Sequence, residues 1–254
     1  MQTYIQPPRE QWAELCRRPA SANPAVRERV ESILERVRTR GDVALRELSL
    51  EIDGRPLDSL EVLPEEIKEA QGQVSDALRR AIAEAEDNIA AFHEAQQPRE
   101  ICVQTDPGVR CIQRPVPIGS VGLYVPGGTA PLFSTVLMLS VPASIARCPE
   151  VVLCTPAGPD GKVNPVVLYA AAFCGVKRIF KIGGALPRAA YVRQALDQSR
   201  AVVLPDPDER VDFANAYAPE HLILATRDPW GLSARITAAG SVFIGPWTPE
   251  SAGD

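Results

Sequence analysis

Residues 120–156 read SVGLYVPGGTAPLFSTVLMLSVPASIARCPEVVLCTP, and this stretch determines the expected fold. An apolar run, SVGLYV, ends in a Pro-Gly-Gly turn, and a long apolar segment of helical character separates it from a second apolar run, EVVLCTP. Short apolar runs separated by helices are typical of βαβ units, in which helices cover both faces of a parallel sheet. The stretch therefore predicts an α/β fold with a Rossmann-like parallel sheet flanked by helices.

The same alternation continues toward the C-terminus. Further helices are expected at 163–175, 186–198, 206–217 and 228–239, and further strands at 176–184, 200–205, 221–226 and 240–246. Because Gly183 and Gly184 end an apolar run and Leu-Pro opens an amphipathic one, Ala185 is expected to join a strand to a helix that begins near Pro187.

The first hundred residues have a different rhythm. Their apolar side chains recur at helical spacing, for example at Val26, Val30, Leu34 and Val37, and Gly41 and Gly54 are suitable helix ends. We therefore expect an N-terminal helical segment, 1–100, that packs on the core. An Asp106-Pro107-Gly108 turn predicts a hairpin at the start of the α/β region, 101–254.

Composition excludes several classes of protein. The chain has 254 residues, a net charge of −5 and a pI near 5.3, which is the wrong sign for binding nucleic acid or an anionic membrane. Its apolar runs are too short to span a bilayer, and the first ten residues lack a signal pattern. The six cysteines show no zinc-knuckle spacing, so a reduced, cytoplasmic location is expected.

Two stretches could support chemistry. The turn after SVGLYV, with Tyr124, Gly127 and Gly128, could bring backbone N–H groups close to a phosphate, or it could be only a tight strand-to-helix turn. In NAYAPEHLIL, Glu220 and His221 combine two proton-transfer groups of different pKa, provided that both lie in the turn before the strand. The alternative is a polar strand entrance.

Together these stretches resemble histidinol dehydrogenase, through RPVPIGSVGLYVPGG, PLFSTVLMLSVPASIA, CGVKRIFKIGGA, NAYAPEHLIL and GSVFIGPWTPESAGD. The resemblance implies oxidation of L-histidinol to L-histidine with NAD and zinc in a homodimer. It implies that Glu220 and His221 are the acid–base pair and that His221 also binds the substrate. Tyr124, Gly127 and Gly128 would bind NAD, and Asp254 would bind both zinc and substrate.

The sequence also departs from that family. After IGGA the family has a further nucleotide-binding segment and a Gln-x-x-His zinc pair, whereas here Ala185 runs directly into LPRAAYVRQAL. The retained half of the NAD-binding domain would then be 121–185, and the Pro-Glu-His segment 186–254. The sequence closes at Asp254, before a further histidine ligand of the family. Apart from His221 it contains one histidine, His93. Two hypotheses stay open: the enzyme, inactive as a single chain, or a non-catalytic remnant that binds nucleotide weakly or joins a partner chain.

Overall fold

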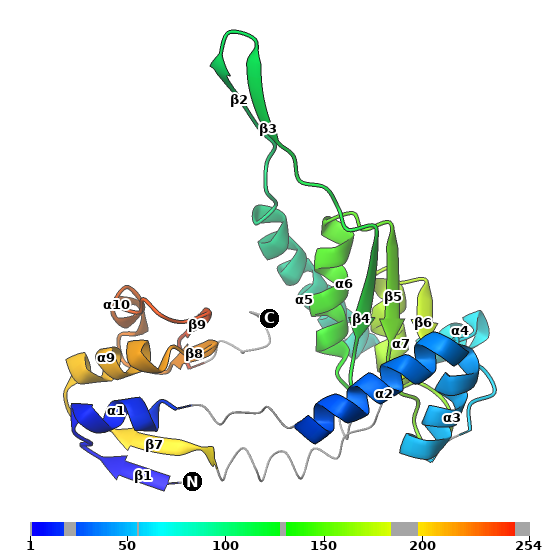
Figure 1. Cartoon of the computed structure of the whole chain (residues 1–254), viewed down its shortest axis with the longest axis horizontal. Coiled ribbons are helices and arrows are strands. Elements are labelled where there is room, and N and C mark those ends of the chain that lie inside the picture. Colours follow the sequence, from blue (N-terminus) through cyan, green and yellow to red (C-terminus); the bar gives the residue numbers. More distant parts are fainter. Residues whose placement is uncertain (1, 18–23, 55, 128–130, 184–197, 247–254) are drawn as a thin grey trace. The chain divides into compact units, whose positions relative to one another are not determined.

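The computed structural model describes residues 2–17, 24–54, 56–127, 131–183 and 198–246, which fall into two units (Figure 1). The central unit is Glu28–Leu186, and the terminal unit combines Met1–Arg27 with Pro187–Asp254. This division differs from the expected boundary near residue 100, because the first strand of the chain pairs with a strand formed after residue 199. The α/β fold class is confirmed.

A three-stranded parallel sheet forms the middle of the central unit. Its strands β4 (Ser120–Tyr124), β5 (Glu150–Cys154) and β6 (Arg178–Phe180) lie in that order, linked by helices α6 (Phe133–Ile145) and α7 (Pro165–Phe173). Leu123, Leu153 and Ile179 are direct cross-strand neighbours and are all buried. This row is the centre of the apolar core.

Two further helices form an outer layer over the crossover helices. α4 (Pro64–Gln73) packs on α7, and α5 (Asp76–Ala95) packs on α6. α4 begins at a proline, which suits the first turn of a helix, and its Glu66 side chain accepts a hydrogen bond from the N–H of Leu63 at 2.9 Å. The buried side chain of Ile82 joins α5 to the same core as the sheet.

The two faces of this sheet are covered unequally, and on the face away from α6 and α7 Phe180 packs in a small cluster with Leu45, Leu57, Leu60 and Ala157. Successive right-handed crossovers in one direction place α6 and α7 on the same face. On the other face Gly122, Tyr124 and Arg178 are exposed. The guanidinium of Arg178 lies over the Phe180 ring and forms a 2.9 Å ion pair with Glu150.

Helix α2 (Pro24–Arg40), from Glu28 onward, and helix α3 (Asp42–Asp53) complete the central unit. α3 ends as expected at Gly54, which adopts a left-handed φ of 66°. The expected apolar stripe of α2 is only partly correct, because Val30 and Leu34 are exposed.

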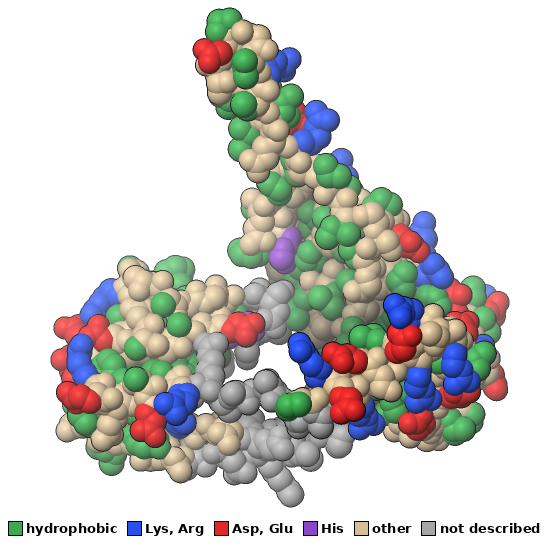
Figure 2. All heavy atoms as spheres, viewed as in Figure 1, with side chains coloured by type: hydrophobic (Ala, Val, Ile, Leu, Met, Phe, Trp, Pro, Cys, Tyr) green, Lys and Arg blue, Asp and Glu red, His purple; other side chains and the backbone are tan. Residues whose placement is uncertain are grey.

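The Asp106–Gly108 turn produces the expected hairpin, formed by the antiparallel strands β2 (Ile101–Asp106) and β3 (Val109–Gln113). Every residue of both strands is exposed, and apolar side chains are visible on the hairpin at the top of Figure 2.

The terminal unit contains two separate pairs of parallel strands. β1 (Gln2–Ile5) pairs with β7 (Arg200–Val203), and β8 (His221–Leu224) pairs with β9 (Ser241–Ile244). The helices are α1 (Arg9–Leu15), α9 (Pro207–Tyr217) and α10 (Pro229–Ser233). Residues 2–5 were expected to belong to a helical segment; they form a strand because β7 offers them a pairing edge.

The contact between α1 and α9 joins the two ends of the chain within the terminal unit. The buried Trp12 ring meets Phe213 edge to face at 5.3 Å, and its Nε1 donates to the carbonyl of Pro7. Among the described helices none is long and apolar enough to cross a membrane. The expected junction at 185–187 lies outside the described residues.

Candidate functional site

Tyr124 lies at the carboxyl end of β4, in register with Cys154 of β5 and, through it, Phe180 of β6. Parallel sheets bind ligands at this end of their strands. The Tyr124 ring is 47% exposed, and its pKa is raised by partial burial and by the negative charge of Asp53. The phenol therefore stays neutral and offers both an aromatic face and a hydrogen-bonding hydroxyl.

A glycine after β6 makes room for this ring. Gly183 has a φ of 137°, and a Cβ at this position would lie 2.6 Å from Cε2 of Tyr124. Gly127, after β4, makes a similarly close approach, since its Cβ would lie 2.5 Å from Cγ of Pro156. The glycine at 127 thus brings two loops of the sheet edge together. Gly128 lies outside the described residues.

A cavity of about 260 Å³ adjoins this edge of the sheet. Gly183 lines it together with Ile182, Lys181 and mainly apolar side chains of α2 and α3. Lys181 is held by a 2.8 Å ion pair with Glu66. Ligand pockets commonly have volumes of about 300–1,000 Å³, so this cavity is smaller than a complete nucleotide site.

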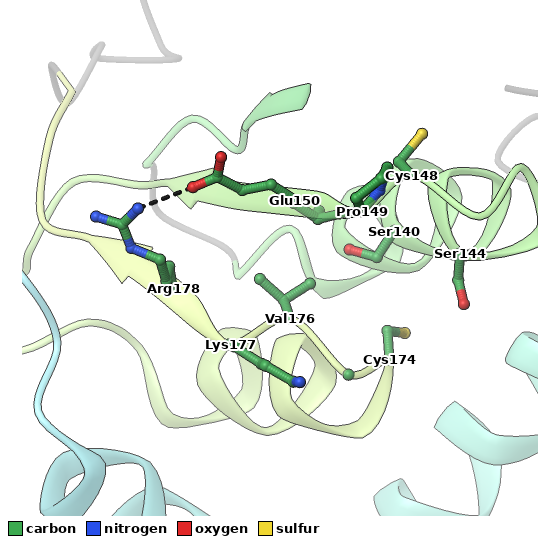
Figure 3. Close-up of a pocket in the computed structure, with 11 residues that line it drawn as sticks. Ser140, Ser144, Cys148, Pro149, Glu150, Cys174, Val176, Lys177 and Arg178 are labelled. Atoms are coloured by element: carbon green, nitrogen blue, oxygen red, sulfur yellow. Dashed lines mark hydrogen bonds and ion pairs between the residues drawn. The ribbon is translucent and has the colours of Figure 1, made fainter. Parts of the chain in front are cut away.

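A second cavity, of about 320 Å³, lies at the amino ends of β5 and β6, the other end of the same sheet (Figure 3). It is lined by Ser140, whose buried hydroxyl has no hydrogen-bond partner in the described part of the chain, and by Cys174. Burial, aided by Glu86, raises the pKa of the Cys174 thiol to about 12. A thiol held protonated is a poor nucleophile, so this cavity is poorly suited to covalent chemistry.

Glu220 and His221 are positioned by the end of α9. The helix stops at Ala218, and a stop is expected for the residue that precedes a proline. Ala218 itself is left-handed, with φ of 50° and ψ of 63°, and not extended as a residue before proline usually is. Glu220 lies in the bend after it and is exposed, whereas His221 is the first residue of β8. The imidazole packs edge to face on the buried Phe243 ring at 5.7 Å. The condition that both residues lie in the turn before the strand is therefore met by Glu220 only, and the pair lies at the amino end of β8, not at the carboxyl end that α/β folds usually use.

Backbone contacts fix the turn that carries Glu220 and leads into His221. The Glu220 carbonyl accepts from Ser241 N–H at 2.8 Å, and the Pro219 carbonyl accepts from Gly240 N–H at 3.0 Å. A Cβ at Gly240 would come within 2.7 Å of the Glu220 carbonyl oxygen, so this position requires glycine.

Asn215 of α9 supports the same turn from the other side. Its amide donates to the Arg235 carbonyl at 3.1 Å and accepts from Thr237 N–H at 2.8 Å, which docks the segment before β9 onto α9. Sequence reasoning did not single out Asn215 or Gly240. Asn215 lies within the NAYAPEHLIL motif, but only the fold shows that it contacts residues twenty positions away.

The candidate residues divide between the two units. Tyr124 and Gly127 belong to the central unit, Glu220 and His221 belong to the terminal unit, and Gly128 and Asp254 lie outside the described residues. His93, on α5, meets the Phe92 ring edge to face at 5.7 Å. Within the described ranges, no three His, Cys, Asp or Glu side chains are grouped to hold a metal ion.

Comparison with known proteins gives a consistent result. The family model described as histidinol dehydrogenase matches residues 16–186 and 185–254. Histidinol dehydrogenases of Bacteroides thetaiotaomicron and Escherichia coli strain K12 are 34% and 36% identical to this chain, over 98% and 96% of it and 82% and 80% of their own lengths. The crystal structure of histidinol dehydrogenase from Elizabethkingia anophelis is similar, with a TM-score of 0.89 at 31% identity, covering all of this chain and 82% of that one.

The chain belongs to the histidinol dehydrogenase family. Membership places it among the oxidoreductases of histidine biosynthesis. The two segments matched by the histidinol dehydrogenase model meet at residues 185–186. The alignments extend over 350 positions, about a hundred more than the 254 residues present here. This confirms that the chain lacks an internal part of the family pattern after Ala185.

Proposed function

We propose that this chain derives from an NAD-dependent histidinol dehydrogenase, that it keeps half of the nucleotide site and the acid–base pair, and that it does not turn over histidinol as a single chain. The observation that carries the proposal is the residue inventory. The sequence contains two histidines, and no group of three metal-binding side chains occurs among the residues that the structure describes.

The residues at the carboxyl end of β4 suit one part of a dinucleotide. Tyr124 is half exposed, and Gly127 lets the loop pass close to Pro156, so the edge offers an aromatic ring beside open backbone. Tyr124, Gly127 and Gly128 would hold NAD, which supplies the hydride acceptor when bound. Half of a site loses contacts as well as preorganisation, so we expect weak binding.

Glu220 and His221 suit the proton transfers of a two-stage alcohol oxidation. Converting a primary alcohol to a carboxylate removes two hydrides, requires two molecules of NAD and consumes one water. His221 would accept protons from the alcohol, and Glu220 would take a proton from the water that attacks the aldehyde stage. The fixed backbone of the Pro219–Glu220 turn would hold both groups at the entrance of β8.

The residues present do not fit zinc. A zinc site requires about three or four N, O or S ligands, and Asp254 is the one ligand that the resemblance assigns in this chain. His221 is committed to proton transfer, and His93 lies on α5 of the other unit beside Phe92. Without the metal, histidinol would lack an anchor, and a displacement of about 1 Å can lower a rate a hundredfold.

Calorimetric titration with NAD tests the nucleotide half of the proposal. We expect a dissociation constant well above the low micromolar range, and weaker binding still in Tyr124→Ala. Phe92→Ala is a suitable control, since it removes a 59% exposed aromatic ring from the same unit without touching the β4 edge. Low-micromolar binding, or an equal loss in both variants, would contradict the assignment.

Turnover tests the catalytic half. With histidinol, NAD and added zinc we expect no NADH, and therefore no change in Glu220→Gln or His221→Ala. Turnover that disappears in His221→Ala would show that a second chain supplies the missing ligands, and the proposed inactivity would be wrong.

Location and assembly are proposed from the same resemblance. A homodimer in the cytoplasm, with L-histidinol as the substrate of the intact site, is what the family implies. The cysteines Cys16, Cys102, Cys111, Cys148, Cys154 and Cys174 are all free thiols, which suits a reducing compartment.

A further inference from the structure

The two edges of the β4–β5–β6 sheet differ in whether another described segment of the chain pairs with them. At the β6 edge, the segment before α4 runs alongside as a strap. Val62 N–H donates to the Ile179 carbonyl at 2.9 Å, and Lys181 N–H donates to the Leu60 carbonyl at 2.7 Å. Glu61 and Phe180 form an antiparallel bridge between them. This edge is closed.

The β4 edge has no such strap among the described residues, where β4 pairs with β5 alone. Val125 N–H donates to Cys154, and the Gly119 carbonyl accepts from Glu150, so residues of odd number direct their backbone groups toward β5. Because successive residues of a strand alternate in direction, Ser120, Gly122 and Tyr124 direct theirs outward. All three residues are exposed.

The β4 sequence lacks the features that protect an exposed edge. Edge strands are usually protected by lysine or another charge, by proline or by a bulge, and Ser-Val-Gly-Leu-Tyr contains none of these. The nearest prolines, Pro117 and Pro126, lie outside the strand and limit the open edge to about the length of β4 itself.

The missing part of the family pattern explains why this edge is open. The unit β4–α6–β5–α7–β6 is one βαβαβ half of a doubly wound sheet, in which the fourth strand lies beside the first. The family match breaks at residues 185–186, directly after this half. The absent positions would therefore begin the half that covers the outer edge of β4.

We propose that a second copy of this chain covers this edge, with the two β4 strands antiparallel across a two-fold axis. Twofold pairing is the commonest symmetry of protein oligomers, and an antiparallel strand at the edge of a parallel sheet is common. In the register centred on Gly122, this residue lies opposite Gly122 of the other copy, and Ser120 lies opposite Tyr124 of the other copy. It gives every outward-facing residue an outward-facing partner, with a small side chain opposite the large one.

The same register continues the core across the interface. Val121 and Leu123 lie on the face covered by α6. In this register, Val121 would lie opposite Leu123 of the second copy, and Leu123 opposite Val121. Apolar cross-strand pairs of this kind stabilise antiparallel strands. The resulting contact is a six-stranded continuous sheet made from two identical edges, a use of β4 that a chain with the complete family pattern would not have available.

Sedimentation of the full chain and, in a separate sample, of its Gly122→Pro variant tests this proposal. The Gly122 N–H faces outward, so proline removes a donor of the open edge without removing a bond to β5, and an added Cβ meets nothing within 4 Å. We expect a concentration-dependent dimer for the original chain and a monomer with unchanged circular dichroism for Gly122→Pro. A monomeric original chain, or a dimer that persists in a folded Gly122→Pro, would overturn the proposal.

Cross-linking tests the register and does not depend on the proline variant folding. In a chain with Cys102→Ser and Cys111→Ser, Gly122→Cys should form an intermolecular disulfide under mild oxidation, because facing residues have Cα atoms about 5.5 Å apart. Ser120→Cys is the matched control on the same strand, since its two copies would be about 13 Å apart in this register. Equal cross-linking of both variants, or none at position 122, would contradict the arrangement.

Hydrogen exchange identifies the occupant of the edge. The amides of Ser120, Gly122 and Tyr124 should become protected as the dimer forms and exchange freely in dilute solution. Protection that is already present in the monomer would place another segment of the same chain on β4 and would overturn the assignment to a second copy.

Discussion

The central and terminal units differ in how each buries its apolar side chains. In the central unit, fifteen buried residues from the sheet, α4, α5, α6, α7 and the segments that connect them form one cluster. In the described part of the terminal unit, the buried apolar residues are spread over the β8–β9 pair, the helices α1 and α9, and the position directly after β7. They are Trp12, Leu15, Leu204, Val211, Leu224 and Phe243.

This difference has a functional consequence. A layered sheet with two helix layers can be stable by itself, whereas an isolated pair of strands is marginally stable in water and depends on the helices packed on it. The candidate nucleotide residues therefore lie on the more independent unit. Glu220 and His221 lie on the unit whose geometry depends on single contacts such as Asn215 and Gly240.

The distribution of tryptophan allows the two units to be observed separately. Of the chain's three tryptophans, Trp12 and Trp230 belong to the described part of the terminal unit, and Trp247 lies outside the described residues. Tryptophan fluorescence thus reports unfolding of the terminal unit, while far-ultraviolet circular dichroism reports both.

The largest effect is expected from Leu153→Ala. Leu153 is completely buried in the central strand of the sheet, and removing a buried leucine side chain costs about 2–5 kcal/mol. In denaturant titrations, the circular dichroism transition should move to lower denaturant while the fluorescence transition stays in place. Leu224→Ala, in β8, should move the fluorescence transition instead. If either variant moves both transitions together, the units unfold as one, and the difference between them does not extend to their stability.

A smaller effect is expected at the glycine that faces Tyr124. Gly183→Ala combines a positive φ of 137° with a Cβ 2.6 Å from the tyrosine ring, and such strain costs on the order of 2–3 kcal/mol. The central unit should lose stability and the absorbance of Tyr124 should change. Gly72→Ala is the control, because Gly72 lies in α4 with open space around it. Equal stability of the two variants would contradict the close approach.

The elements that depend on local pattern were predicted correctly from the sequence. The βαβαβ alternation, the hairpin turn and the helix stop before Pro219 depend on neighbouring residues, and the structure confirms each. The N-terminal strand could not be predicted, because Gln2–Ile5 is extended only through pairing with Arg200–Val203, about two hundred positions away.

The candidate site was predictable as residue types in motifs and not as a constellation. The Pro-Glu-His motif and the Pro-Gly-Gly turn were recognised from sequence, and their roles stay predictions. The contacts that support these motifs in space join segments distant in sequence. They are the hydrogen bonds of the Asn215 side chain and the close approaches at Gly183 and Gly240. No periodic pattern marks such contacts.

Asn215→Ala should weaken the terminal unit alone. The substitution removes one hydrogen bond to the Arg235 carbonyl and one from Thr237 N–H, a loss of about 1–2 kcal/mol. The fluorescence transition should shift and the central-unit transition should not. Asn215→Asp, which keeps the acceptor for Thr237, should recover part of the loss; if it is no better than alanine, the hydrogen bond from Thr237 N–H makes no measurable contribution.

The smallest effect concerns two ion pairs on α4 and tests whether the burial of an ion pair decides its contribution to the stability of the central unit. Glu66 and Glu69 of α4 each pair with a lysine, Lys181 at 2.8 Å and Lys162 at 2.9 Å. The first pair is largely buried, with side chains 9% and 16% exposed, and the second is 53% and 52% exposed. Exposed pairs contribute little to stability because water and salt screen them.

Glu66→Gln should therefore destabilise the central unit by about 1 kcal/mol at neutral pH, while Glu69→Gln should have no measurable effect. Burial acts to raise the pKa of the Glu66 carboxyl, but hydrogen bonds from Lys181 and from Leu63 N–H outweigh it and lower that pKa. A lowered pKa means that the stabilisation is present above the ordinary carboxyl value of about 4.3 and is lost as the pH falls through the folded-state pKa. Denaturant titrations from pH 7 to pH 3 should then show the gap between the original chain and Glu66→Gln closing at the acid end. A gap that persists at pH 3, or one that Glu69→Gln reproduces, would show that the burial of the Lys181 pair does not distinguish it from the exposed one.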